Sequence, residues 1–216
     1  MKWLCGLLLI VFSNGSGAQN TSLPVVENSS PLAAYSSEWN NPLYDKCNTA
    51  SKALYMKDPE REVIYILNLL RVYPALFAKT VLAKYPSVSG NDNLMNDQYY
   101  YQSLVKEMLS MKQAPLLYAD EKCFNSAICH AKTSGNSGYT GHERKTADCG
   151  KKKYFSAECC DYGNEEPLEI VLSLLIDTDV PSLGHRRALL GSYDKIGVSI
   201  QPHKTYQYNT VLDFDY

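Results

Sequence analysis

The sequence has almost no net charge, and it has no long apolar run beyond its first residues. Its 21 basic and 23 acidic residues give a formal charge of −2, which provides no basic surface for nucleic acid or an acidic membrane. The apolar run near the start is far shorter than the roughly 20 residues that a membrane-spanning helix needs, and no later segment reaches that length. We therefore expect no nucleic-acid partner and no membrane span.

Several short catalytic and metal-binding motifs are also missing. The chain has no Gly-x-Ser-x-Gly elbow and no His-Glu-x-x-His helix, which argues against an α/β-hydrolase and a zincin protease. No Cys-x-x-Cys pair is present for a zinc knuckle. A cysteine nucleophile at Cys159 or Cys160 stays an alternative, but disulfide pairing in an oxidising compartment is the simpler use of these residues.

The size and the first residues predict one exported domain. The chain has 216 residues, 45% of them hydrophobic, which suits a single globular domain with short extensions. Lys2, the apolar run 4–12 and the small residues 16–18 before Gln19 have the order of an export signal. We expect a signal peptide at 1–19 and a secreted or periplasmic mature protein.

The cysteines support the same compartment. Cys5 falls in the predicted signal, and six remain: Cys47, Cys123, Cys129, Cys149, Cys159 and Cys160. An even number in an exported chain favours disulfides, although the sequence alone leaves many pairings open. Their clustering suggests that Cys149 pairs with Cys159 or Cys160 across a short loop.

Residues 20–57 are rich in Ser, Asn and Pro, so we expect a loosely ordered N-terminal arm pinned at Cys47. The domain itself is expected at 58–216. Apolar residues at helical spacing and capping residues predict its helices, which cover residues 58–72, 75–84, 97–112, 120–134, 165–175 and 182–190.

The remaining segments predict a long loop and a few strands. Residues 135–153 are small, polar and glycine-bearing, 154–160 is typical of a strand, and 196–201 with 206–214 forms a hairpin around Pro202-His203-Lys204. Helices come first and paired strands last, without β-α-β alternation. This order predicts an α+β domain with an antiparallel sheet.

The chain has only four histidines. His142 and His185 each follow a glycine, which lets the backbone approach closely and leaves the imidazole unobstructed. His130 lies on a predicted helix and is expected to be a packed side chain. His203 lies in the predicted hairpin turn and is expected to be solvated.

Several blocks along the chain carry a family resemblance. They are Tyr162-Gly163, Leu168-Glu169-Ile170-Val171, Leu174-Leu175-Ile176-Asp177, Gly184-His185-Arg186-Arg187-Ala188-Leu189-Leu190 and Ile196-Gly197-Val198, with an upstream block from Glu62 to Arg71 followed by Pro74. Together they resemble bacterial members of the CAP superfamily, the group of cysteine-rich secretory proteins, antigen 5 and plant pathogenesis-related 1 proteins. The resemblance spans roughly residues 58–216.

The resemblance implies a three-layer α-β-α sandwich whose cleft is lined by two histidines and two acids. Matched position by position, these four fall on His142, Glu158, Asp177 and His185, hereafter the tetrad. This chain departs from the family pattern around the acids, because Ala157 and Cys159 replace Gly and Asn, Leu174 replaces Trp, and Asp177 replaces Glu. Nearby acids that compete for the acidic roles are Glu143, Glu165, Glu166 and Asp179.

The chemistry of these residue types leaves three functions open. His142 and His185 can bind a divalent metal such as Zn²⁺ while the carboxylates orient the rings. The first hypothesis is a binding module for an extracellular glycan, peptide or lipid, with or without the metal. The second is a metal-assisted hydrolase with Glu158 or Asp177 as base. The third is a structural or interaction protein whose tetrad is a stabilising hydrogen-bond network.

Overall fold

The computed structural model describes residues 30–89 and 98–216. The predicted signal peptide at 1–19, the first part of the arm and Cys5 lie outside these residues. Within the described part of the chain, no single helix is long and apolar enough to cross a membrane. The helices Asp58–Val72 and Pro74–Tyr85 meet that test only as a pair, and the chain bends by 105° between them.

Four strands form one sheet in the order β1-β3-β4-β2. They are β1 (Tyr118–Ala119), β2 (Ala157–Tyr162), β3 (Lys195–His203) and β4 (Gln207–Asp215). The pairs β3/β4 and β2/β4 are antiparallel, as the sequence predicts. The two-residue edge strand β1 is parallel to β3, so the predicted antiparallel sheet carries one parallel edge strand and is mixed as a whole.

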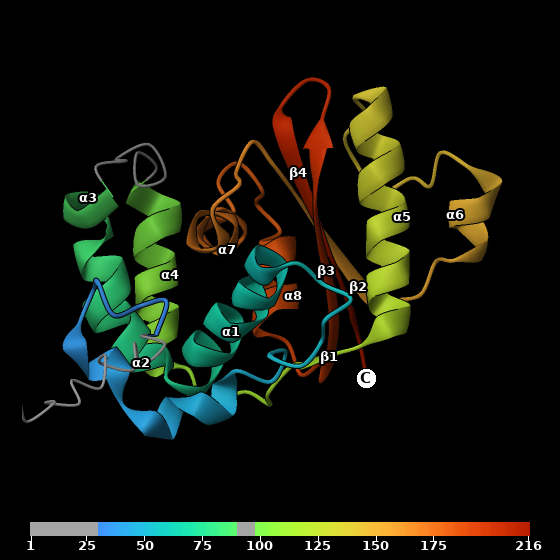
Figure 1. Ribbon diagram of the computed structural model, residues 1–216. Coiled ribbons are helices and arrows are strands. Elements are labelled where there is room, and N and C mark those ends of the chain that lie inside the picture. The colour runs from blue at the N-terminus through green and yellow to red at the C-terminus, as the bar shows by residue number, and fades with distance from the viewer. Residues whose placement is uncertain (1–29, 90–97) are drawn as a thin grey trace, which may run out of the picture.

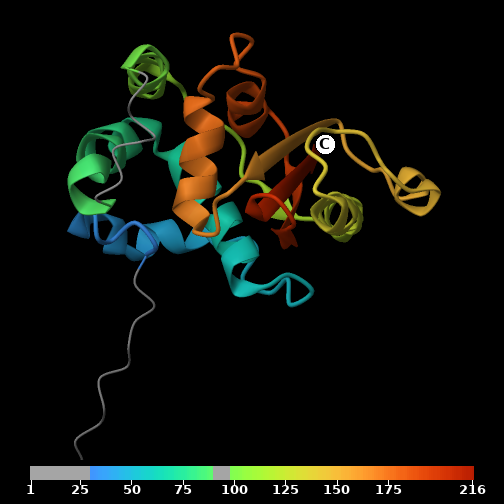
Figure 2. The ribbon, with the colours of Figure 1, turned by 90° about the horizontal axis from the view of Figure 1, so that it is seen from above.

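Helices cover both faces of this sheet (Figure 1). One face packs against α5 (Glu121–Ser137), and the other packs against α1 (Asp58–Val72), α7 (Pro167–Ile176) and α8 (Gly184–Leu190). The view from above shows the strands between these two layers (Figure 2). The α+β class and the three-layer α-β-α arrangement are therefore confirmed.

The other helical segments extend these layers. α2 (Pro74–Phe77), a π-helical turn (Ala78–Leu82), α3 (Ala83–Ser89) and α4 (Gln98–Ser110) follow α1, and α6 (Ala147–Lys151) lies outside α5. Two 3₁₀ helices, Ser37–Asn40 and Pro42–Cys47, precede α1. The helix expected at 75–84 is thus present as three joined pieces.

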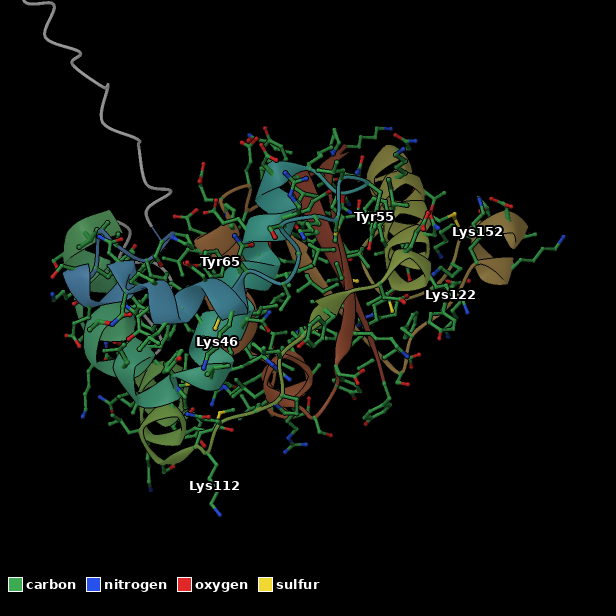
Figure 3. The ribbon with its side chains drawn as sticks, turned by 60° about the horizontal axis from the view of Figure 1, so that its bottom comes forward. Lys46, Tyr55, Tyr65, Lys112, Lys122 and Lys152 are labelled. Atoms are coloured by element: carbon green, nitrogen blue, oxygen red, sulfur yellow. A yellow bond between two sulfur atoms is a disulfide. The ribbon has the colours of Figure 1, made fainter. Side chains whose placement is uncertain are left out.

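The described part of the arm belongs to the core, which corrects the expectation of loose order. Leu32, Trp39 and Cys47 are buried, and the Trp39 indole donates to Thr80 Oγ1 at 3.0 Å. At the other end of the arm Tyr55 lies beside α5 (Figure 3), where its ring packs on that of Phe124 with centroids 5.2 Å apart. The polar composition of the arm did not reveal this order, because a few apolar side chains are enough to order the whole segment.

The predicted loop 135–153 is shorter than expected, because α5 continues to Ser137 and Thr146 caps the added helix α6. A disulfide between Cys129 and Cys149 holds α6 to α5, with Cα atoms 5.5 Å apart. The prediction that Cys149 pairs with Cys159 or Cys160 is therefore wrong. Those two cysteines are buried within β2 and free, as are Cys47 and Cys123.

Two smaller expectations about the strands also change. The segment expected to be a strand from residue 154 pairs only from Ala157 onward. His203, expected to be solvated, is buried: its Nδ1 accepts from the backbone N–H groups of Thr205 and Tyr206, and its Nε2 lies 3.1 Å from the carbonyl oxygen of Tyr139. This imidazole therefore fixes the turn between β3 and β4.

Gly197 on β3 allows α5 to sit directly on the sheet. A Cβ atom at this position would lie 2.0 Å from the backbone nitrogen of Phe124, so the backbones would have to separate. We expect Gly197→Ala to lower the free energy of unfolding by about 2 kcal/mol, as overpacking does. Gly150→Ala, in α6, is the control, because nothing lies within 4 Å of its added Cβ. Denaturant midpoints measure both, and equal midpoints would contradict the packing argument.

Candidate functional site

The structure brings all four tetrad residues together. His142 lies in the loop between α5 and α6, Glu158 on β2, Asp177 at the end of α7 and His185 in the first turn of α8. His142 Nδ1 lies 2.9 Å from Glu158 Oε1, and His185 Nδ1 lies 2.7 Å from Asp177 Oδ1. The centroids of the two imidazole rings are 6.4 Å apart. The site is therefore two imidazole–carboxylate pairs side by side.

Asp177 owes its position to the way α7 ends. Its backbone is left-handed, with φ of 59°, a conformation that a short polar residue tolerates. This turn directs the carboxylate at the start of α8, where Oδ2 accepts from the backbone N–H of His185 at 3.0 Å. Asp177 thus caps α8 and holds the His185 ring, which gives a physical role to the shorter acid at this position.

Glu158 is held from two sides. Its side chain is only 2% exposed, and Arg144 Nη2 lies 2.6 Å from its Oε2. Asp213 is its direct neighbour across the β2/β4 pair, and Arg144 Nη2 lies 3.4 Å from Asp213 Oδ2. The three side chains Arg144, Glu158 and Asp213 therefore form a buried charge cluster behind His142.

The cluster divides its charge unevenly. Burial alone would raise the pKa of Glu158, but the hydrogen bonds from His142 and Arg144 outweigh it and hold that pKa well below its usual range. Burial and the neighbouring Glu158 charge raise the pKa of Asp213 far above its usual range. At neutral pH, Glu158 is therefore the ionised acid and Asp213 keeps its proton. Arg144 and Asp213 were not predicted from the sequence, although an acid between Leu212 and Phe214 in an apolar strand was a usable signal.

The two histidines differ from their acids in exposure. The side chains are 57% exposed for His142 and 25% for His185, whereas Asp177 is buried like Glu158. Because each Nδ1 is engaged by a carboxylate, each Nε2 is left to bind a metal or a ligand.

Neither of the two hollows described in the fold, about 1040 Å³ beside the arm and 160 Å³ beside Lys57, is lined by a tetrad residue.

The competing acids lie elsewhere. Glu143 pairs with Lys145, Glu165 is hydrogen-bonded to Tyr208, and Glu166 occupies the N-cap position of α7 without a side-chain capping bond. Asp179 lies in the turn after α7 with φ of 62°. The two acids bonded to the histidine rings are thus the two that the resemblance names.

A further group of possible metal ligands lies behind His142. One donor atom each from His130, Glu158 and Cys160 lies within 4.8 Å of the other two. His130 is fully buried, as expected for a packed side chain, with Nε2 2.9 Å from the carbonyl oxygen of Gly141. These three residues were not connected from the sequence, because His130 lies on α5 and the other two lie on β2.

The fold and the site together define a class: an α-β-α domain with two imidazole–carboxylate pairs beside one edge strand of its sheet. A family model described as CAP, the cysteine-rich secretory protein family, matches residues 64–214, and the chain belongs to this family. Comparisons with curated proteins and with solved structures gave no significant match. The family resemblance of the sequence blocks is confirmed.

Proposed function

We propose that this chain is a secreted CAP protein that binds an extracellular ligand at the surface between His142 and His185, with a divalent metal such as Zn²⁺ held by the two Nε2 atoms. Export through a signal peptide at 1–19 and a mature domain at 58–216 are part of this proposal. The short apolar run and the Cys129–Cys149 disulfide support it, because disulfides persist in oxidising compartments.

The donor set fits a metal. A carboxylate bonded to Nδ1 fixes the ring orientation and keeps the proton on that nitrogen, so the lone pair of Nε2 is free to bind an ion. Both tetrad histidines are arranged in this way, at 2.9 Å and 2.7 Å from their acids. A divalent ion on two imidazoles has open positions for oxygen ligands, which glycans, peptides and lipid head groups all provide.

One observation favours binding over hydrolysis. All four carboxylate oxygens of the tetrad are engaged: those of Glu158 by His142 and Arg144, and those of Asp177 by the His185 ring and backbone. A general base needs a carboxylate oxygen within reach of its water. Both acids are buried and hydrogen-bonded, so they position the imidazoles.

Calorimetric titration of the metal-free protein with Zn²⁺ tests the proposal. We expect His185→Asn to lose one equivalent of zinc relative to the wild type, and Asp177→Asn to weaken that equivalent about 10–100-fold, as loss of an orienting carboxylate does. Glu143→Gln is the control, because this acid is 70% exposed and pairs with Lys145.

Unchanged zinc uptake by His185→Asn would remove the metal from the proposal. If, in addition, the tetrad substitutions only lowered the melting temperature, the tetrad would be a stabilising network. If the zinc-loaded wild type hydrolysed a substrate and His185→Asn abolished that activity, the result would instead favour the hydrolase hypothesis.

A further inference from the structure

The buried triad consists of His130 on α5 with Glu158 and Cys160 on β2. His130 is fully buried, and the side chain of Glu158 and the whole of Cys160 are nearly so. Glu158 and Cys160 are two residues apart on one strand, so both project from the same face of the sheet, toward α5. Three types of zinc-ligating atom therefore converge inside the domain.

His130 carries a nitrogen that the protein leaves unused. Its Nδ1 is buried and has no hydrogen-bond partner among the described residues, while Nε2 is engaged by Gly141. Leaving a buried polar atom unpaired costs about 1–3 kcal/mol. Burial and the nearby Arg144 charge also lower the pKa of His130, so the ring is neutral, which is the form that binds metals.

Cys160 contributes a free thiol that lies close to the other donor atoms. It takes no part in the disulfide, and its Sγ lies 3.8 Å from His142 Nδ1. Since that nitrogen is 2.9 Å from Glu158 Oε1, His142 stands at the open side of the triad. Its Nδ1 keeps its proton in the hydrogen bond to Glu158, so His142 orients that carboxylate and does not bind the buried ion itself.

The spacing is close to that of a coordinated ion. Tetrahedral zinc, with Zn–S near 2.3 Å and Zn–N near 2.0–2.1 Å, places sulfur and nitrogen about 3.5 Å apart. The triad atoms, all within 4.8 Å of one another, need to close by little more than an ångström. Thiolate with imidazole selects zinc and similar ions over magnesium or calcium.

The charges allow such an ion. Arg144 binds Glu158 Oε2 at 2.6 Å, and Oε1 accepts from His142 with one of its two lone pairs, which leaves the other for an ion. The thiolate and the carboxylate offset most of the charge of the ion and of Arg144, which leaves a net charge of +1 in the buried cluster. Binding replaces the Sγ–H bond of Cys160 by an Sγ–metal bond and releases one proton to the buffer.

We propose that His130, Glu158 and Cys160, with His142 at the open side, form a second, sulfur-containing site for a zinc-like divalent ion. It differs from the tetrad site in its ligands, because Cys160 and His130 belong only to the buried site and His185 only to the tetrad. The two proposals can therefore fail separately.

Cobalt(II) is the probe, because thiolate ligation gives an intense sulfur-to-cobalt charge-transfer absorption that nitrogen and oxygen ligands do not give. We expect this band in the cobalt-loaded wild type and in His185→Asn, and its loss in Cys160→Ser and His130→Gln. Cys47→Ser is the matched control, because Cys47 is another buried free thiol, at the end of a 3₁₀ helix. A band that survives Cys160→Ser, or that is absent from the wild type, would overturn the proposal.

X-ray absorption at the zinc edge tests the same site without a substitution, so it stands even if a variant fails to fold. Wild-type protein loaded with two equivalents of zinc should show sulfur neighbours at about 2.3 Å. A zinc environment of nitrogen and oxygen alone would refute the buried site and leave the tetrad proposal untouched.

Discussion

Replacing Arg186 by methionine is expected to lower the free energy of unfolding by about 4 kcal/mol, whereas Arg187→Met should change it by less than about 0.5 kcal/mol. The two arginines are neighbours on α8, so both variants lose one guanidinium from the same helix. Arg186 is buried and Arg187 is exposed. Comparing the two variants therefore separates the effect of burial and hydrogen bonding on stability from the effects of helix propensity and net charge.

The reason lies in what the Arg186 guanidinium holds together. Its Nε donates to the carbonyl oxygen of Leu175 at 2.6 Å, and Nη2 donates to those of Ile176 and Tyr100 at 2.9 and 3.0 Å. Nη1 lies 2.9 Å from Ser103 Oγ. Methionine would leave these acceptors unpaired in the interior, at about 1–3 kcal/mol for each group that water cannot reach.

Thermal and urea unfolding measure the effect. At roughly 2–4 °C per kcal/mol for a chain of this size, Arg186→Met should melt about 10 °C below Arg187→Met. Similar melting temperatures for the two variants would mean that this hydrogen-bond hub does not hold α4, α7 and α8 together.

Asp213→Asn should stabilise the metal-free protein increasingly as the pH rises. A carboxyl whose pKa is higher in the folded than in the unfolded chain contributes stability that is complete below its ordinary value of 3.8 and is lost as the pH rises toward the folded value. Asparagine mimics the protonated acid and cannot lose its proton. The gap in the free energy of unfolding between variant and wild type should therefore widen by up to about 1.4 kcal/mol per pH unit between about pH 5 and pH 8.

Urea titrations with a chelator present, at several pH values, measure that gap. Asp215→Asn, two residues along the same strand, is the control, because a hydrogen bond from Ser156 lowers the pKa of Asp215. Its contribution is present above 3.8 and lost only as the pH falls, so its gap should stay flat over this range. A flat gap for Asp213→Asn as well would show that Asp213 is ionised beside Glu158.

The elements that rest on periodicity were the most predictable. The helix expected at 58–72 matches α1, because its apolar stripe is long and Pro74 follows it. The C-terminal hairpin was also predicted, although β3 continues through Pro202 and His203 before the turn. Edge strand β1 was missed, because two residues are too few to show an alternation.

Contacts that depend on strand register could not be predicted. Glu158 meets Asp213 only because β2 pairs with β4 in one particular register, and a shift of one residue would turn every side chain to the other face. The same register sets Cys160 against α5 and Cys159 against α8. The sequence located the histidines and their acids through a resemblance, but it could not reveal the buried cluster behind them.

Closeness in sequence also predicted the wrong disulfide, because tertiary structure decides which cysteines meet. Cys149, Cys159 and Cys160 are close in sequence, yet Cys149 bonds to Cys129 on α5. The cause is the short helix α6, which its Thr146 cap and Cys149 direct back onto α5. Closeness along the chain is therefore a poor guide to a disulfide when a helix intervenes.

Anomalous diffraction at the zinc edge, from crystals of zinc-loaded protein, shows whether the tetrad holds a metal. We expect a zinc peak within bonding distance of Nε2 of both His142 and His185, with Glu158 and Asp177 still bonded to the Nδ1 atoms. No peak between those two nitrogens at saturating zinc would contradict the proposal that the tetrad is a metal-dependent binding site.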